Sequence, residues 1–173
     1  GLAYGELKRY HEAIDCYKKA IQFLPNDPML HFNLGYFYQT VGQKNNALES
    51  LEKARAIQPQ HKPTLEMLGN LYLDMKNYPR AIEIYNTYAT LEPKNPVVLN
   101  NLGFAYGEIG KLDEAIQCYQ RSIKLEPNDP ITRVNLASAY RRLKKVNLAI
   151  KEYESAYKLD PQNPDILQPL SQL

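Results

Sequence analysis

A 34-residue period runs through most of this 173-residue chain and constrains its fold more than any other feature. Four columns keep one residue type, or nearly so, in five successive copies. They are glycine at Gly1, Gly35, Gly69 and Gly103, with Ala137 in the fifth copy; tyrosine at Tyr4, Tyr38, Tyr72, Tyr106 and Tyr140; alanine at Ala13, Ala47, Ala81, Ala115 and Ala149; and proline at Pro25, Pro59, Pro93, Pro127 and Pro161. Such a period is typical of proteins in which each copy is one supersecondary unit.

Each copy is predicted to fold as two amphipathic helices separated by a turn. In the fourth copy, apolar residues recur at three- and four-residue steps from Leu99 to Tyr106, and again from Ala115 to Ile123. Asn or Asp followed by Pro precedes most first helices, which supplies a capping oxygen and a preset first turn. Gly42 and Gly110 are expected to end first helices, and the proline column ends the second.

The glycine column falls inside a predicted helix. The stretch from Gly103 to Gly110, GFAYGEIG, has neither G-x-G-x-x-G nor G-x-x-x-x-G-K-[ST] spacing. A glycine within a helix costs about 1 kcal/mol relative to alanine, so a recurring one needs an offsetting gain. We expect close helix approach to supply it, with Gly103 facing Ala115 and with Tyr106 and Tyr119 alongside. Mid-helix N–H groups are already bonded, which argues against a phosphate-binding loop.

These columns resemble the tetratricopeptide repeat, whose pattern is W-x2-L-G-x2-Y, then A-x3-F, then P. Leu102, Gly103, Tyr106, Ala115, Tyr119 and Pro127 match it in order, with Leu99 at the Trp position. The chain departs from the pattern in having no Trp, and Leu51 stands at the second-helix aromatic position. The resemblance implies an all-α fold, a right-handed superhelical solenoid of helix–turn–helix tetratricopeptide repeats.

The period divides the chain into a partial first repeat (1–27), four repeats (28–61, 62–95, 96–129 and 130–163) and the start of a sixth repeat or a tail (164–173). All are expected to form one solenoid domain, which we interpret as a piece of a longer array. Pro169 would interrupt the sixth first helix. Both ends are expected to leave apolar residues uncovered, including Leu2, Tyr153 and Leu159, so self-association through uncapped ends is a further hypothesis.

The resemblance also implies a function, because first helices in this family line a concave groove that takes peptides. Helical spacing places these residues on that face: Met29, Phe32, Asn33, Tyr36, Gln39 and Thr40; Glu66, Met67, Asn70 and Asp74; Val97, Asn100, Asn101, Phe104, Gly107 and Glu108; and Ile131, Val134, Asn135, Ser138, Arg141 and Arg142. From this set we predict a peptide-binding groove made by Phe32, Asn33, Tyr36, Met67, Asn70, Asn100, Asn101, Phe104, Asn135 and Arg141.

An asparagine recurs at the sixth position of the repeat, as Asn33, Asn101 and Asn135, and only Met67 breaks the series. Asparagine is a poor helix former, so the column suggests another role. A row of amides can bind the backbone of an extended peptide. The row is similar to the asparagine ladder in the repeat domain of O-linked N-acetylglucosamine transferases, which binds peptide backbone. The alternative is that the amides bridge neighbouring helices or bind water.

Three aromatic residues on the same face, Phe32, Tyr36 and Phe104, would anchor side chains of a partner, or else pack within the fold. A chaperone-type carboxylate clamp is disfavoured. Members of the family that clamp a C-terminal carboxylate carry cations at three positions where this chain has Glu66, Ile131 and Asn135.

Nucleic acid is disfavoured as a partner. The net charge is only +2, and the basic cluster RRLKK at 141–145 is offset by Glu66, Asp74 and Glu108 on the predicted groove face. No apolar run approaches the roughly 18 residues that a membrane span requires, so no membrane partner is expected.

Catalysis finds no support in these residues, because there is no G-x-S-x-G and no Cys matched with a His. Cys16 and Cys118 share one repeat position, predicted on the outer side, and form no disulfide framework. No metal-ligand spacing is present, and no cofactor is expected. The sequence therefore predicts a non-catalytic protein-interaction scaffold, with an intracellular location slightly favoured. The alternatives are a substrate-recruiting array of a larger enzyme, such as a glycosyltransferase, and a less favoured RNA-binding helical repeat.

Overall fold

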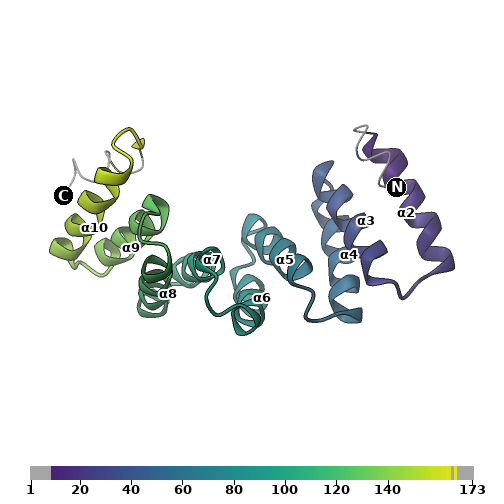
Figure 1. Ribbon diagram of the computed structural model, residues 1–173, viewed down its shortest axis with the longest axis horizontal. Coiled ribbons are helices and arrows are strands. Elements are labelled where there is room, and N and C mark those ends of the chain that lie inside the picture. The colour runs from purple at the N-terminus through teal and green to yellow at the C-terminus, as the bar shows by residue number, and fades with distance from the viewer. Residues whose placement is uncertain (1–8, 165, 167–173) are drawn as a thin grey trace. The chain divides into compact units, whose positions relative to one another are not determined.

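The computed structural model describes residues 9–164 and 166, and all the regular structure in these ranges is helical (Figure 1). The chain divides into two compact units, residues 1–77 and residues 78–173, which we call the N-terminal and the C-terminal unit. The all-α class and the helix–turn–helix repeat predicted from the period are confirmed.

The N-terminal unit contains α2 (Tyr10–Phe23), α3 (Pro28–Thr40), α4 (Lys44–Ile57) and α5 (Lys62–Asp74). The helices α3 and α4 form one hairpin, α2 packs against α3, and α4 packs against α5. The first helices of the repeats, α3 and α5, have 13 residues each, and the second helices, α2 and α4, have 14.

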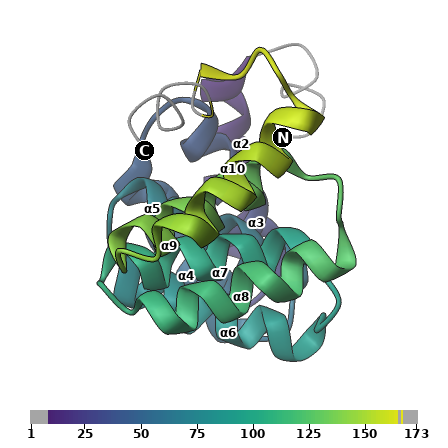
Figure 2. The same cartoon turned by 90° about the vertical axis from the view of Figure 1, so that its left-hand side faces the viewer.

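The C-terminal unit contains α6 (Tyr78–Leu91), α7 (Pro96–Glu108), α8 (Leu112–Leu125), α9 (Pro130–Arg142) and α10 (Val146–Leu159). Here α7 with α8, and α9 with α10, form helical hairpins, while α6 packs against α7 and α8 against α9. Figure 2 turns this unit toward the viewer and shows α9 beside α10.

Three of the first helices begin with the predicted cap. The side chain of Asp27 accepts hydrogen bonds from the backbone N–H groups of α3, Asn95 does so for α7, and Asp129 for α9; each is followed by Pro in the first turn. These oxygens satisfy N–H groups that the helix leaves without an internal partner. Helix α5 lacks this cap, and His61 Nδ1 instead lies 2.7 Å from the Thr64 hydroxyl.

The turn within each complete repeat uses a left-handed residue just beyond the first helix. Gly42 and Gly110 have φ values of 77° and 81°, as predicted, and the same position in the other two repeats is held by Lys76 (φ 57°) and Lys144 (φ 58°). In all four repeats the next backbone N–H donates to the carbonyl of the motif tyrosine, at 2.8–3.0 Å. This arrangement is the Schellman closure of a helix end, and it requires positive φ whichever residue is present.

The residues of the alanine column lie in the interior, where neighbouring helices pack together. Ala13, Ala47, Ala81, Ala115 and Ala149 are all fully buried. In the C-terminal unit, Ala115 belongs to a core with Tyr119, Leu136, Tyr140 and Tyr153. Small residues at these positions bring the helices close, and the tyrosines fill the space beside them.

The expected pairing of Gly103 with Ala115 is wrong. A Cβ on Gly103 would lie 2.7 Å from Cε1 and 2.9 Å from Cδ1 of Tyr119, so the aromatic ring rests on the glycine. Ala115 instead faces Gly107, at 3.9 Å from the position of a Cβ there. The reason is that the tyrosine lies one helical turn beyond Ala115 and reaches across the helix pair.

Two expectations about exposure also need correction. Tyr153 is buried in the core of the C-terminal unit and leaves no uncovered apolar face, whereas Leu159 is exposed. Cys118 is buried between helices although it was placed on the outer side, and Cys16 is partly buried. Leu2 and Pro169 lie outside the described residues, so the expectations about them stay predictions.

Candidate functional site

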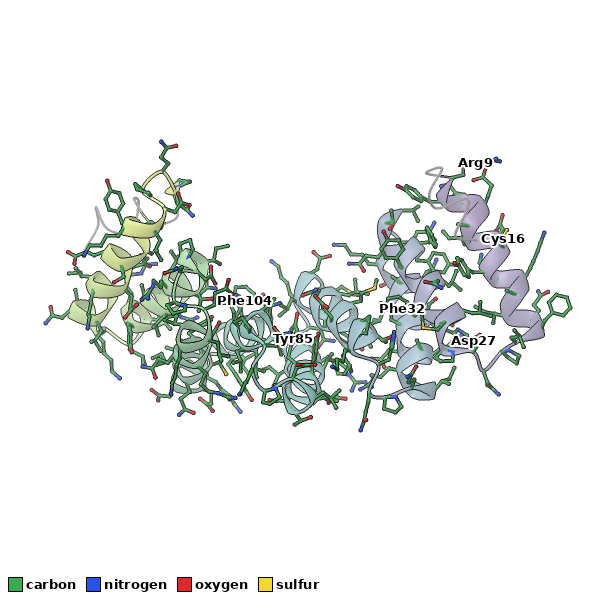
Figure 3. The ribbon with its side chains drawn as sticks, in the orientation of Figure 1. Arg9, Cys16, Asp27, Phe32, Tyr85 and Phe104 are labelled. Carbon is green, nitrogen blue, oxygen red and sulfur yellow. The ribbon has the colours of Figure 1, made fainter. Side chains whose placement is uncertain are left out.

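The exposed face of α3 carries the aromatic residues predicted for the N-terminal unit. Tyr36 is half exposed, with its ring edge-on to Phe37 at a centroid distance of 5.2 Å. Phe32 is partly buried because its ring lies edge-on to His61, at 5.3 Å (Figure 3). Of the predicted pair, Tyr36 is the one that offers a large open apolar surface.

The remaining predicted residues of this unit are polar or flexible. Asn33 on α3 and Met67 on α5 are partly buried, while Asn70 on α5 is exposed. Asp74, at the end of α5, pairs with Lys44 at 2.6 Å, so this acid is already neutralised within the unit.

In the C-terminal unit the predicted aromatic residue is Phe104 on α7, which is 39% exposed (Figure 3). Its ring lies edge-on to that of Tyr78, with the two ring centroids 6.3 Å apart. Arg141 near the end of α9 is exposed. The neighbouring Arg142 is held in place, because its Nη1 donates to the carbonyl of Gly107 at 2.8 Å. Arg141 stays a predicted site residue, and the structure adds Arg142, whose side chain joins α9 to α7.

The asparagine column is partly engaged inside the C-terminal unit. Asn101 Nδ2 donates to the Tyr85 hydroxyl at 3.2 Å, and Asn135 Nδ2 donates to Asn100 Oδ1 at 3.0 Å. The second bond joins α7 to α9. Bridging between helices, the alternative left open by the sequence, therefore occurs at both of these asparagines.

A cavity of about 70 Å³ opens between α7 and α9. Its lining includes Phe104, Gly107, Glu108, Asn135 and Arg142, all of which the sequence placed on this face, together with Tyr119 from the second helix α8. Tyr119 was expected only in the core. Burial raises the pKa of its hydroxyl above the usual range, so the phenol is neutral and able to donate.

Glu108 at the rim of this cavity also interacts with Tyr78. Burial and a hydrogen bond to the Glu108 carboxylate raise the pKa of the Tyr78 hydroxyl. A carboxylate that accepts this bond is held by its neighbour and still offers further acceptor positions.

Sequence reasoning missed a second cavity, of about 220 Å³, on the N-terminal unit. Its lining includes Lys18, His31, Tyr38, Glu49 and Lys53. Its charged side chains already have partners within the unit. Lys53 Nζ lies 2.6 Å from Glu49 Oε1, and Lys18 Nζ lies 5.8 Å from the centroid of the Tyr38 ring.

The signal that could have pointed to it is a polar residue in an apolar column. His31 stands where other repeats have Leu65 and Leu99, and its Nε2 lies 2.7 Å from the Pro25 carbonyl oxygen. Arg133 in the same column makes the equivalent bond to the Pro127 carbonyl, at 2.9 Å from Nη2. Both polar side chains are thus explained by a proline carbonyl six residues earlier.

Residues 9–164 and 166 contain no group of three or more His, Cys, Asp or Glu side chains arranged to hold a metal ion. None of the helices within these ranges is both long and apolar enough to cross a membrane.

Comparison with known families supports the repeat assignment along the chain. Tetratricopeptide repeat models match residues 41–100, 96–129 and 132–163, and a TPR repeat model matches residues 1–42. No curated protein sequence matches the chain.

Solved structures of repeat proteins are similar in fold. A crystal structure of MamA is 23% identical with a TM-score of 0.86, over 92% of this chain and 94% of that one. MamA residues 41 to the end from Desulfovibrio magneticus RS-1 is 21% identical with a TM-score of 0.83, over 91% and 90%. YrrB, described as a TPR protein with an unusual peptide-binding site, is 17% identical with a TM-score of 0.92, over 99% and 88%.

Proposed function

This chain belongs to the tetratricopeptide repeat family, and on that basis we propose that it is a non-catalytic scaffold that binds an extended peptide segment of a partner protein on its first-helix faces. The observation that carries the proposal is periodic apolar exposure. Met29, Val97 and Ile131 share the second position of the repeat, and Tyr36 and Phe104 share the ninth; all five are exposed. Single exposed apolar residues are ordinary, but here Met29 and Tyr36 share one helix of the N-terminal unit, and Val97, Phe104 and Ile131 lie on the first helices of the C-terminal unit.

The amides on these first helices suit an extended backbone. A side-chain amide has two N–H donors and a carbonyl acceptor, and Asn135 uses one donor on Asn100. Binding through main-chain groups gives affinity, and pockets for alternate side chains give selectivity. A substrate-recruiting array in a larger enzyme, such as a glycosyltransferase, would use the same faces in the same way.

Selection from a random library of 12-residue displayed peptides, followed by anisotropy titration of the enriched peptides, tests this function. We expect Kd to rise at least tenfold in a variant with Asn33, Asn101 and Asn135 changed to Ala. The matched control changes the exposed Asn45, Asn128 and Asn147, which lie outside the first helices, and should bind as the wild type does. Both variants must melt as cooperatively as the wild type.

The proposal fails if no peptide is enriched, or if the enriched peptides bind the first-helix variant as tightly as they bind the control. RNA binding makes the opposite prediction for salt. Phosphate contacts would make the affinity fall steeply between 50 and 200 mM salt, whereas peptide binding through amides and apolar contacts should change little.

A further inference from the structure

The cavity between α7 and α9 contains a hydroxyl group that the fold leaves without a partner. Tyr119 is 3% exposed, and within residues 9–164 and 166 its hydroxyl makes no hydrogen bond. Every fully buried side-chain polar atom in the same ranges does have a partner. The Tyr119 oxygen must therefore reach the cavity that this residue lines, next to Gly107, where it lies 3.9 Å from the position of a Cβ.

Tyr85 and Tyr153 occupy the repeat position of Tyr119 in the preceding and the following repeat, and comparison with them shows what is unusual about the surroundings of Tyr119. The Tyr85 hydroxyl accepts from Asn101, which is the sixth-position asparagine of the following repeat. Burial raises the pKa of the Tyr153 hydroxyl, and the side chain of Ser138, the ninth-position residue of its own repeat, counteracts part of that rise. For Tyr119, the corresponding asparagine is Asn135, which is turned to Asn100, and the ninth position is an aromatic residue. Both of its usual partners are therefore absent, and a buried neutral donor points into an open cavity.

The other polar groups of the cavity are held in place. Arg142 donates one N–H to the Gly107 carbonyl, and a guanidinium has five such donors in a rigid fork. Glu108 supplies a carboxylate acceptor on the same lining. The lining thus carries one cation and one anion, together with the neutral phenol, the Asn135 amide and the Ser138 hydroxyl.

This balance selects against an anionic guest. A carboxylate would gain Arg142 but would meet Glu108 and the carbonyl end of α7, which carries partial negative charge. A primary carboxamide suits both kinds of group, because its oxygen accepts from the Tyr119 hydroxyl or Arg142 while its NH2 donates to Glu108. The cavity volume of about 70 Å³ admits such a group, being roughly twice the volume of a water molecule in the liquid.

We propose that this cavity is a side-chain subsite for an Asn or Gln residue of the bound peptide, with the Tyr119 hydroxyl as its central donor. The inference rests on the proposed function for its biological setting. Its chemistry can be tested separately, with a probe small enough to need no groove.

Propionamide, propionate and butanone are matched probes, since they share size and shape and differ in the group attached to the carbonyl. Each is titrated into the 173-residue chain, and NMR shifts of the Asn135 side-chain amide and the Phe104 backbone amide report binding. We expect propionamide to bind at least five times more tightly than propionate or butanone. Equal binding of the three probes, tighter propionate binding, or no propionamide shift up to 200 mM would each overturn the proposal.

Three variants test whether propionamide binds in this cavity. Tyr119→Phe keeps the ring and removes the hydroxyl, so propionamide affinity should fall roughly 3- to 10-fold, the effect of one hydrogen bond. Gly107→Ala places a methyl group among the cavity groups without a clash and should abolish the shift. Tyr140→Phe removes a hydroxyl that accepts from Gln120 and does not line the cavity, so it should leave the affinity unchanged. An unchanged affinity in both Tyr119→Phe and Gly107→Ala would overturn the subsite.

The peptides selected against the wild-type chain separate this inference from the proposed function. A fixed Asn or Gln in the enriched peptides that disappears when Tyr119→Phe is the target supports the subsite. Enriched peptides without that preference overturn the subsite and leave peptide binding intact. Propionamide binding without any enriched peptide supports the subsite and contradicts the proposed function.

Discussion

The ring of Tyr119 rests directly on Gly103, so that a Cβ added to the glycine would lie 2.7 Å from Cε1 of the ring. Alanine at residue 103 would gain about 1 kcal/mol of helix propensity but would displace a buried ring. We expect overpacking to prevail, so that Gly103→Ala lowers the free energy of unfolding by about 1–3 kcal/mol.

Gly107→Ala is the matched control for that substitution. It lies on the same helix, and its nearest contacts from an added Cβ are 3.7 Å or longer. This variant should be neutral or more stable by up to about 1 kcal/mol. Urea denaturation of both variants distinguishes the two effects, and equal changes would contradict the assigned contact.

Replacing either of the two lysines that have positive φ is expected to stabilise the protein. Lys76 and Lys144 adopt the left-handed conformation that glycine takes at Gly42 and Gly110. Because a non-glycine residue in this region is strained by roughly 1 kcal/mol, Lys76→Gly and Lys144→Gly should each raise the free energy of unfolding by about 0.5–1 kcal/mol.

The reverse substitution checks the sign. A Cβ on Gly110 would have nothing within 4 Å, so any loss in Gly110→Ala comes from φ and not from a clash. We expect a loss of about 1 kcal/mol by thermal or urea unfolding. A stable Gly110→Ala variant would show that the turn adopts another conformation.

Ala115 is fully buried in the helix pair of the fourth repeat. Ala115→Leu would force extra carbon atoms between α7 and α8 and should cost about 1–3 kcal/mol. Ala56→Leu, at an exposed position of α4, changes the same atoms without burial and should stay within about 0.5 kcal/mol of the wild type. Similar melting curves for the two variants would contradict the packing of this column.

The two thiols should differ in reactivity with pH. Desolvation raises the pKa of the buried Cys118 thiol, so less thiolate is present at any pH near 8. Cys16 is only partly buried, and we expect it to react first with a disulfide reagent in the native chain. Because the folded-state pKa of Cys118 is raised, its contribution to stability is present below the unfolded-state pKa and is lost as pH rises toward the folded value.

Single-cysteine variants provide the comparison for the thiols. Cys16→Ser leaves Cys118 alone, and its labelling at pH 8 should be slower than that of the Cys118→Ser variant. In denaturant the two should label at similar rates. Fast native labelling of Cys118 would mean that the helix packing around it opens readily.

The amino-acid sequence by itself determined the local structure of this protein. The period located the helix pairs, Asp27 and Asn95 identified the caps, and Gly42 and Gly110 marked the helix ends. These features depend on backbone chemistry and helical spacing within about 34 residues, so the same local structure recurs in each copy of the repeat.

Only the tertiary structure decided which side chains meet. Column positions place Asn101 and Asn135 on one face, but one bonds to Tyr85 and the other to Asn100. That difference leaves the Tyr119 hydroxyl without a partner and brings it to the cavity beside Arg142. Such pairings join residues from different helices and depend on the packing of several neighbours at once. A periodic pattern describes each position separately, so it cannot determine them.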